Sequence, residues 1–172
     1  MTGAFIGVGS NIEPAANVRK ALQVMSEEMR VVATSTVYET EAESHPEQPP
    51  YYNCVVEVET ETPPLELKRR LRAIEERLGR RRSEDRYAPR PIDLDLLLYD
   101  NQAMQSEELT VPDPEIERRA YLAAGLAELA PELSLPGRTE TLAELARRLP
   151  HEGMRPLEDY TSALRKEATD GR

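Results

Sequence analysis

The sequence predicts an α+β fold with a ferredoxin-like βαββαβ core, in which helices pack on an antiparallel sheet and further helices follow toward the C-terminus. Two observations carry this prediction. Runs of apolar or β-branched residues long enough for a strand alternate with two amphipathic helical stretches in the order β-α-β-β-α-β. Within the strand expected at 51–60, Val56 and Val58 alternate with Glu57 and Glu59, the period of a half-buried strand.

Short-range patterns define the first half of the core. Residues 4–9 are an apolar run that ends in a Gly-Ser-Asn turn, which is typical of a strand and the loop after it. Apolar side chains recur at i, i+4, i+7 and i+11 across 14–30, as in an amphipathic helix. Residues 31–38 are rich in β-branched side chains and favour a second strand. The proline-containing stretch 39–50 is expected to be a loop, and loops of this length often carry function.

Residues typical of helix ends mark both limits of the second helix, which follows the strand at 51–60. Thr62 is a candidate N-cap, Pro63 fits the first turn, and Gly79 fits the C-terminal cap. An arginine-rich loop then leads into an apolar strand at 92–99, which completes the core.

Two more helices are expected at 115–130 and 139–149. Residues 1–150 are therefore predicted to form a single domain, which is long enough to enclose a proper hydrophobic core. Residues 151–172 are expected to be a charged C-terminal tail that frays.

Composition excludes several classes of protein. A hydrophobic content of 39% with 31% charged residues indicates a globular domain, and no apolar run approaches the ~20 residues that span a bilayer. The net charge of −10 argues against a general nucleic-acid binder. The single cysteine, Cys54, cannot form an internal disulfide, so a reducing cytoplasm is expected. We expect a monomer that acts on small molecules.

Two aspartates of the strand at 92–99 are the first candidates for chemistry. Successive side chains of a strand point to opposite faces, so Asp93 and Asp95 share one face, roughly 7 Å apart. Neighbouring carboxylates repel each other, and a hard cation such as Mg²⁺ would relieve that repulsion. The alternative is the solvated face of an edge strand, which needs no ligand.

A cluster of arginines lies just upstream of these aspartates. A guanidinium group stays charged and binds oxyanions with two parallel hydrogen bonds, which suits phosphate. Paired aspartates beside clustered arginines therefore suggest metal-dependent chemistry on a polyphosphate. The cluster consists of Arg80, Arg81, Arg82, Arg86 and Arg90.

Four collinear segments, spread over about residues 4 to 136, form a recognisable pattern. They are Gly7-Val-Gly-Ser-Asn11, Tyr51-Tyr-Asn53, Arg86-Tyr-Ala-Pro-Arg-Pro-Ile-Asp-Leu-Asp95, and Val111-Pro112 followed by Arg119-Ala-Tyr121 and Ala130-Pro-Glu-Leu133. The pattern resembles the 6-hydroxymethyl-7,8-dihydropterin pyrophosphokinase family. The resemblance implies a ferredoxin-like pyrophosphokinase domain that transfers pyrophosphate from ATP to 6-hydroxymethyl-7,8-dihydropterin in folate biosynthesis and releases AMP.

The resemblance also implies roles for individual residues. Asp93 and Asp95 correspond to the ligands of two Mg²⁺ ions, and Arg80 and Arg90 to arginines that contact the phosphates. These four residues form the implied catalytic set.

The resemblance implies roles for two further groups of residues. Glu75 and Arg119 correspond to residues that bind the nucleotide. The pterin contacts fall at Thr40, Tyr51, Asn53 and Tyr121. Tyr121 stands where a phenylalanine is common, so the stacking ring is kept and a hydroxyl is added.

The chain departs from the family's pattern in its nucleotide region. Asp113 stands where a histidine is usual, Ser83 where a basic residue is common, and Tyr87 where a tryptophan is often found. Because negative charge near a triphosphate is unfavourable, we expect Asp113 to turn outward or to pair with Arg118 or Arg119.

Two other functions remain open from the residues alone. A metal-dependent nucleotide-sugar transferase could use the Asp93-Leu-Asp95 segment, although such enzymes generally need a larger nucleotide-binding domain. A non-catalytic ferredoxin-like module could bind a small ligand, but it would not need paired aspartates beside arginines. Formation of AMP from Mg-ATP and the pterin would separate these alternatives.

Overall fold

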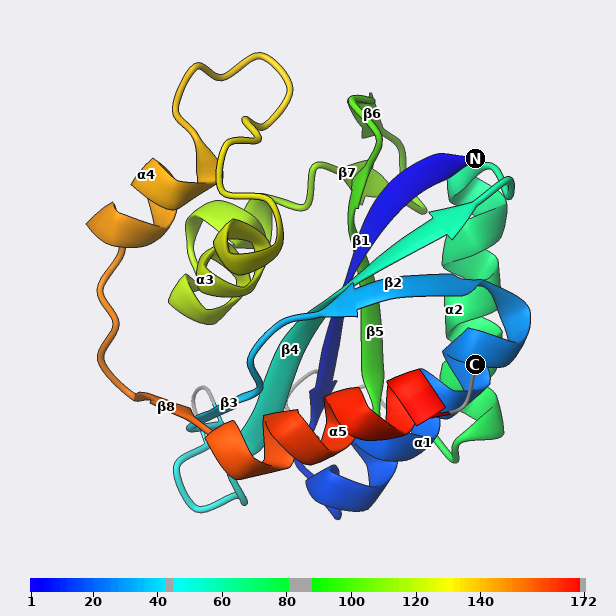
Figure 1. The fold of residues 1–172 in the computed structure, drawn as a ribbon, viewed down its shortest axis with the longest axis vertical. Coiled ribbons are helices and arrows are strands. Elements are labelled where there is room, and N and C mark those ends of the chain that lie inside the picture. The colour runs from blue at the N-terminus through cyan, green and yellow to red at the C-terminus, as the bar shows by residue number, and fades with distance from the viewer. Residues whose placement is uncertain (43–44, 81–87, 171–172) are drawn as a thin grey trace.

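The computed structural model of the chain describes residues 1–42, 45–80 and 88–170 (Figure 1). The predictions for Arg81, Arg82, Ser83, Arg86 and Tyr87 lie outside these ranges. In chain order the described elements are β1 (Thr2–Ser10), α1 (Pro14–Glu28), β2 (Arg30–Thr34), β3 (Tyr38–Thr40), β4 (Tyr51–Thr60), α2 (Pro64–Arg77), β5 (Asp93–Tyr99), β6 (Met104–Gln105), β7 (Thr110–Val111), the 3-10 helix η1 (Pro114–Glu117), α3 (Ala120–Leu129), α4 (Leu142–Arg148), β8 (Met154–Pro156) and α5 (Glu158–Asp170).

The main sheet follows the order β5-β1-β4-β3-β8, and β2 also pairs with β4. Every described strand pair is antiparallel. Helices α1, α2 and α5 lie on one side of this sheet, and α3 and α4 lie on the other (Figure 1). The predicted α+β fold with its βαββαβ core is confirmed. No helix in the described ranges is long and apolar enough to cross a membrane.

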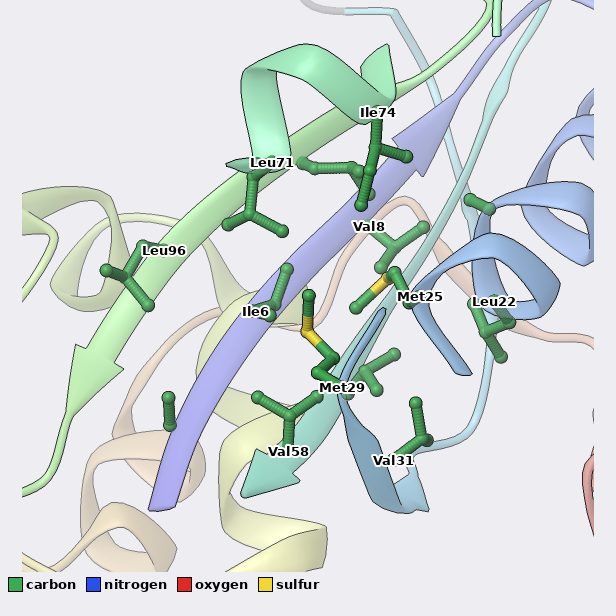
Figure 2. Packing of buried hydrophobic residues seen from close by; sticks show 14 of the residues in the cluster. Ile6, Val8, Leu22, Met25, Met29, Val31, Val58, Leu71, Ile74 and Leu96 are labelled. Carbon is green, nitrogen blue, oxygen red and sulfur yellow. The ribbon is translucent and has the colours of Figure 1, made fainter. Parts of the chain in front are cut away.

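The larger hydrophobic core lies between the sheet and helices α1, α2 and α5. Figure 2 shows the part of it that packs between the sheet and α1 and α2. On β1, Ile6 and Val8 point into this core, while Gly7 and Gly9, which alternate with them, face the opposite side of the sheet. The apolar stripe of α1 supplies Leu22 and Met25, and that of α2 supplies Leu71. Each fully buried side chain of this size contributes about 1.5–3 kcal/mol to folding.

A smaller core occupies only part of the sheet's other face, under α3 and α4. Helix α3 approaches β4 closely at Gly125, where a Cβ atom would lie 2.6 Å from Cγ2 of Val55. The rest of this face, where β1 ends and β5 begins, belongs to neither core. It carries the glycines of β1 and the aspartates of β5, so the fold leaves a polar half-face open beside α3.

Three boundaries differ from the sequence prediction. The strand expected at 31–38 is divided into β2 and β3, and the helix expected at 115–130 is divided into η1 and α3, because Arg119 has an extended backbone with φ −108° and ψ 109°. Thr62 is not the N-cap of α2. That position is Pro63, and the carbonyl of Thr62 accepts a hydrogen bond from the Tyr99 hydroxyl at 2.7 Å.

The C-terminal segment differs most from expectation. Instead of a fraying tail, β8 pairs with β3, and α5 packs against the sheet through Leu164, which is 2% exposed. Helix α5 also completes the hydrogen bonds of the break between β2 and β3. The backbone N–H of Val37 donates to Oγ1 of Thr161 at 2.9 Å, and Nε of Arg165 donates to the carbonyl of Thr34 at 3.0 Å.

Candidate active site

The open half-face of the sheet forms one wall of a cavity of about 320 Å³. In the strand register Gly9 pairs with Asp93 on one side and with Asn53 on the other, and Gly7 pairs with Asp95. The cavity gathers eight of the ten predicted site residues. Arg90, Asp93, Asp95 and Arg119 come from the predicted nucleotide side, and Thr40, Tyr51, Asn53 and Tyr121 from the predicted pterin side.

Asp93 is held by two arginines. Its Oδ1 accepts a hydrogen bond from Nη1 of Arg80 at 2.8 Å, and its Oδ2 accepts one from Nη1 of Arg90 at 3.1 Å. The side chain of Asp93 is 22% exposed, so these ion pairs lie at the cavity wall and not in bulk water. Positive charge is therefore concentrated around the first aspartate of the pair.

Asp95 lies on the same face and has a different environment. It borders the cavity and is only partly exposed. Burial, followed by the negative charges of Asp93 and Asp113, raises the pKa of the Asp95 carboxyl well above its usual range. A cation at this position would stabilise the charged form. Within the described ranges no group of three or more His, Cys, Asp or Glu side chains is arranged to hold a metal.

Glu75 and Arg80 stand behind the cavity wall, outside its lining. The side chain of Glu75 reaches from α2 to the edge strand β5, where its Oε2 accepts the backbone N–H of Leu94 at 2.8 Å. The same oxygen forms an ion pair with Arg80. Burial raises the pKa of Glu75, which is only 3% exposed. Glu75 thus fixes Arg80, and Arg80 in turn contacts Asp93.

The predicted pterin side is built on β3 and β4. Nδ2 of Asn53 donates a hydrogen bond to Oγ1 of Thr40 at 2.8 Å, and both residues are buried. Tyr51 lies nearby with a half-buried ring, and burial raises the pKa of its phenol. The positive charges of Arg90, Arg80 and Arg119 act on that phenol in the opposite direction. The arginines therefore converge where the two predicted subsites meet.

Arg119 lies at the N-cap of α3 and is bonded to Glu115 and to Tyr121. Its Nε donates to Oε2 of Glu115 at 2.6 Å, and its Nη1 donates to the hydroxyl of Tyr121 at 2.8 Å. The sequence predicted Arg119 and Tyr121 for different substrates. The structure joins them by a hydrogen bond.

Asn11 helps to build the site, although no role was predicted for it from the sequence. Its backbone N–H donates to the carbonyl of Arg90 at 3.1 Å, and its Oδ1 accepts the N–H of Arg90 at 2.7 Å. Its Nδ2 donates to Oε1 of Gln48 at 3.1 Å, so one buried side chain ties two loops together. The Gly7–Asn11 segment was a signal for Asn11, but no local pattern indicated Gln48.

The prediction for Asp113 is wrong. Asp113 borders the cavity, and its Oδ1 accepts the backbone N–H of Glu115 at 2.9 Å as the cap of η1. Arg118 and Arg119 both pair with Glu115 instead, because the i, i+3 and i, i+4 spacings bring them to that carboxylate. Burial raises the pKa of Asp113.

Comparison with known proteins identifies the family. A model of the 7,8-dihydro-6-hydroxymethylpterin-pyrophosphokinase family matches residues 5–131. The 2-amino-4-hydroxy-6-hydroxymethyldihydropteridine pyrophosphokinase of Haemophilus influenzae is 36% identical over 150 residues, which cover 86% of this chain and 92% of that protein. The protein of the same name from Pseudomonas aeruginosa is 36% identical over 156 residues, covering 89% and 95%.

Solved structures support the fold. A crystal structure of an HPPK-DHPS in complex with substrates has a TM-score of 0.66 at 13% identity, and the likeness covers 85% of this chain and 43% of that chain. Plasmodium falciparum HPPK-DHPS with pteroate has a TM-score of 0.67 at 14% identity, with 86% and 42% covered. This chain thus spans less than half of these solved chains. With the family model and the curated relatives, the comparison shows that the chain belongs to the 7,8-dihydro-6-hydroxymethylpterin-pyrophosphokinase family, the ATP-dependent pyrophosphokinases of folate biosynthesis.

Proposed function

We propose that the chain transfers pyrophosphate from Mg-ATP to 6-hydroxymethyl-7,8-dihydropterin and releases AMP. One arrangement carries the proposal: paired aspartates and converging arginines share a single cavity with the Asn53–Thr40 pair and the Tyr121 ring. The first group suits a polyphosphate, and the second suits a flat, polar-edged ring.

Asp93 and Asp95 fit the binding of Mg²⁺. This ion is usually held by one or two carboxylates together with water and substrate phosphates, so no larger protein cage is required. When bound, two such ions would neutralise the phosphates around an in-line displacement. Metal at Asp93 would compete with the ion pairs from Arg80 and Arg90, and those guanidinium groups could then donate to phosphate oxygens.

The reaction mainly requires that the two substrates be held in the correct relative position. The hydroxymethyl oxygen of the pterin forms a bond to the β-phosphorus, while the bond from that phosphorus to the oxygen bridging the α and β positions breaks. The electrons of the broken bond leave with AMP, and the hydroxyl proton passes to water. Fixed guanidinium groups stabilise charge that develops on the transferred phosphoryl oxygens.

Asn53 and Thr40 supply polar contacts for the pterin edge. Nδ2 of Asn53 is bonded to Thr40, which leaves its Oδ1 to accept a hydrogen bond from an amino group. The Thr40 hydroxyl, which accepts that bond, keeps its own proton to donate. Together the two side chains offer an acceptor and a donor, as an amino-pyrimidinone edge requires.

The test is AMP release from Mg-ATP in the presence and absence of the pterin. Arg90→Ala should lower turnover about a hundredfold, since one contact to a transferring phosphoryl group contributes about 3 kcal/mol. Arg148→Ala is the matched control, because Arg148 pairs with Glu140 at the surface. Hydrolysis of a nucleotide sugar, or ligand binding without AMP, would favour one of the two alternative functions.

Three further proposals follow from the same assignment. The pyrophosphokinase machinery lies within residues 1–150, since the ten residues predicted for the site fall between positions 40 and 121 and Asn11, which holds Arg90, also lies in this range. The chain acts as a monomer, since eight of the ten predicted site residues of a single chain already meet in one cavity. It works in the cytoplasm, where a lone buried thiol such as Cys54 stays reduced. Light scattering at micromolar concentration tests the monomer.

A further inference from the structure

A chain of three side chains, Glu115, Arg119 and Tyr121, runs along one side of the cavity. Glu115 is in η1, Arg119 is the residue before α3, and Tyr121 is in the first turn of α3. All three border the cavity. The carboxylate of Glu115 accepts from one end of the guanidinium, and the hydroxyl of Tyr121 accepts from the other.

This arrangement fixes a group that is otherwise mobile. An arginine side chain loses up to about 2 kcal/mol of rotamer entropy when it is ordered, and these two bonds meet only part of that cost before a ligand arrives, because the side chain is still 35% exposed. The guanidinium is planar, so bonds from Nε and Nη1 set both its position and its plane.

The hydroxyl of Tyr121 provides the second of the two bonds that restrain the Arg119 guanidinium. Burial raises the pKa of the Tyr121 phenol, so the hydroxyl is neutral at physiological pH and accepts from Arg119 with its oxygen. Tyr121 lines the cavity together with Leu122. A phenylalanine would provide the same ring without the contact to Arg119.

Glu117, the other glutamate of η1, also forms an ion pair, and a comparison of the two shows that the location of Glu115 beside the cavity distinguishes it. Glu117 pairs with Arg138 at 3.1 Å, but that arginine side chain is 61% exposed and neither residue borders the cavity. The Arg119 side chain is 35% exposed and does border it. The hydrogen bond from Arg119 lowers the pKa of Glu115, so the carboxylate is charged under assay conditions.

We propose that Glu115 and the hydroxyl of Tyr121 are positioning groups that hold the Arg119 guanidinium and thereby couple the two substrate subsites. An acceptor seated against the Tyr121 ring restricts the hydroxyl, which restricts Arg119 and improves phosphate binding. By linkage, nucleotide bound at Arg119 strengthens binding of the acceptor by the same factor. This inference rests on the proposed function, because it assumes one phosphate-bearing and one flat ring substrate.

The test measures the dissociation constant of α,β-methylene-ATP with Mg²⁺, by calorimetry, in the absence and in the presence of saturating pterin. The ratio of the two constants is the coupling factor, which we expect to be at least fivefold for the wild type. Tyr121→Phe and Glu115→Gln should each bring this factor below twofold, and the double variant should lose no more. Because the coupling factor is a ratio of two dissociation constants, a substitution that weakens nucleotide binding equally with and without the pterin leaves it unchanged.

Glu117→Gln is the matched control and should keep the wild-type coupling factor. An unchanged factor in Tyr121→Phe and Glu115→Gln, with AMP still formed by the wild type, would overturn the coupling and leave the proposed function standing. An equal fall in Glu117→Gln would also overturn it, since the effect would then come from η1 as a whole. Absence of AMP from the wild type would overturn both.

Discussion

The side chain of Asn53 lies directly against the backbone of Gly9. A Cβ atom at Gly9 would stand 2.7 Å from Oδ1 of Asn53, closer than real Cβ contacts allow. The two residues are register partners on neighbouring strands. Glycine at this position therefore gives the Asn53 amide the room to reach Thr40.

Gly9→Ala should displace the Asn53 amide and weaken pterin binding about tenfold, which corresponds to about 1.4 kcal/mol. Gly3→Ala is the matched control, because Gly3 is in the same strand and has nothing within 4 Å of the added carbon. Fluorescence titration with the pterin measures both affinities. Equal affinities in the two variants would show that Asn53 is not a pterin contact.

Asp95→Asn should nearly abolish AMP formation in Mg²⁺ while keeping the fold. Its effect on stability should have the opposite sign. The folded-state pKa of Asp95 lies above its ordinary value, so the stability of the wild type falls as the pH rises from that ordinary value through the folded-state pKa. At pH 8 in EDTA the variant should therefore melt at the same temperature as the wild type or higher.

Glu28→Gln makes the same change of charge at an exposed position and serves as the control for Asp95→Asn. Substantial turnover of the Asp95 variant in Mg²⁺ would refute the metal assignment. A lower melting temperature in EDTA would show that the Asp95 carboxylate is stabilised by the fold itself.

The sequence predicted those parts of the site that depend on local geometry. The two-residue period of a strand was enough to place Asp93 and Asp95 on one face, and Gly79 ends α2 with φ +97° as a C-terminal cap should. Contacts between distant residues left no such signal. Asn11 is hydrogen-bonded to the backbone of Arg90, 79 positions away in the sequence, and no periodic pattern indicates this contact.

The edge position of β5 and the break between β2 and β3 could not be predicted from the sequence either. Glu75 has the spacing of an ordinary helix residue, and its role depends on β5 being an edge strand with a free N–H at Leu94. The β2–β3 break depends on side chains from α5, more than a hundred residues later. A composition of charged residues made that helix resemble a tail.

Thr161→Val should therefore destabilise the protein although Thr161 lies far from the cavity. The substitution keeps the shape of the side chain and removes the acceptor of the buried Val37 N–H, at a cost of about 1–3 kcal/mol. Ser162→Ala is the control, since the neighbouring Ser162 is exposed. Urea denaturation gives both free energies of unfolding, and a difference below about 0.5 kcal/mol would mean that α5 does not secure the break.

Asp113 provides the last prediction, because it is a carboxylate at the wall of a cavity that we propose to bind a triphosphate. Like charges 6 Å apart at an effective dielectric constant near 20 repel by roughly 3 kcal/mol, and salt and solvent reduce this to a fraction. Asp113→Asn removes the charge and keeps the oxygen that accepts the Glu115 N–H. We expect it to lower the KM for Mg-ATP by about twofold to tenfold, with the KM for the pterin unchanged.

Asp113→Ala separates the charge of Asp113 from its capping role. It should share the lower KM for Mg-ATP but lose about 1 kcal/mol of stability, because the N–H of Glu115 loses its acceptor. The measurement is a titration of Mg-ATP at saturating pterin for the wild type and both variants. A large fall in kcat for Asp113→Asn, with its fold and KM intact, would instead make the carboxylate a ligand for metal or water, since the amide keeps the cap but cannot replace a negative ligand.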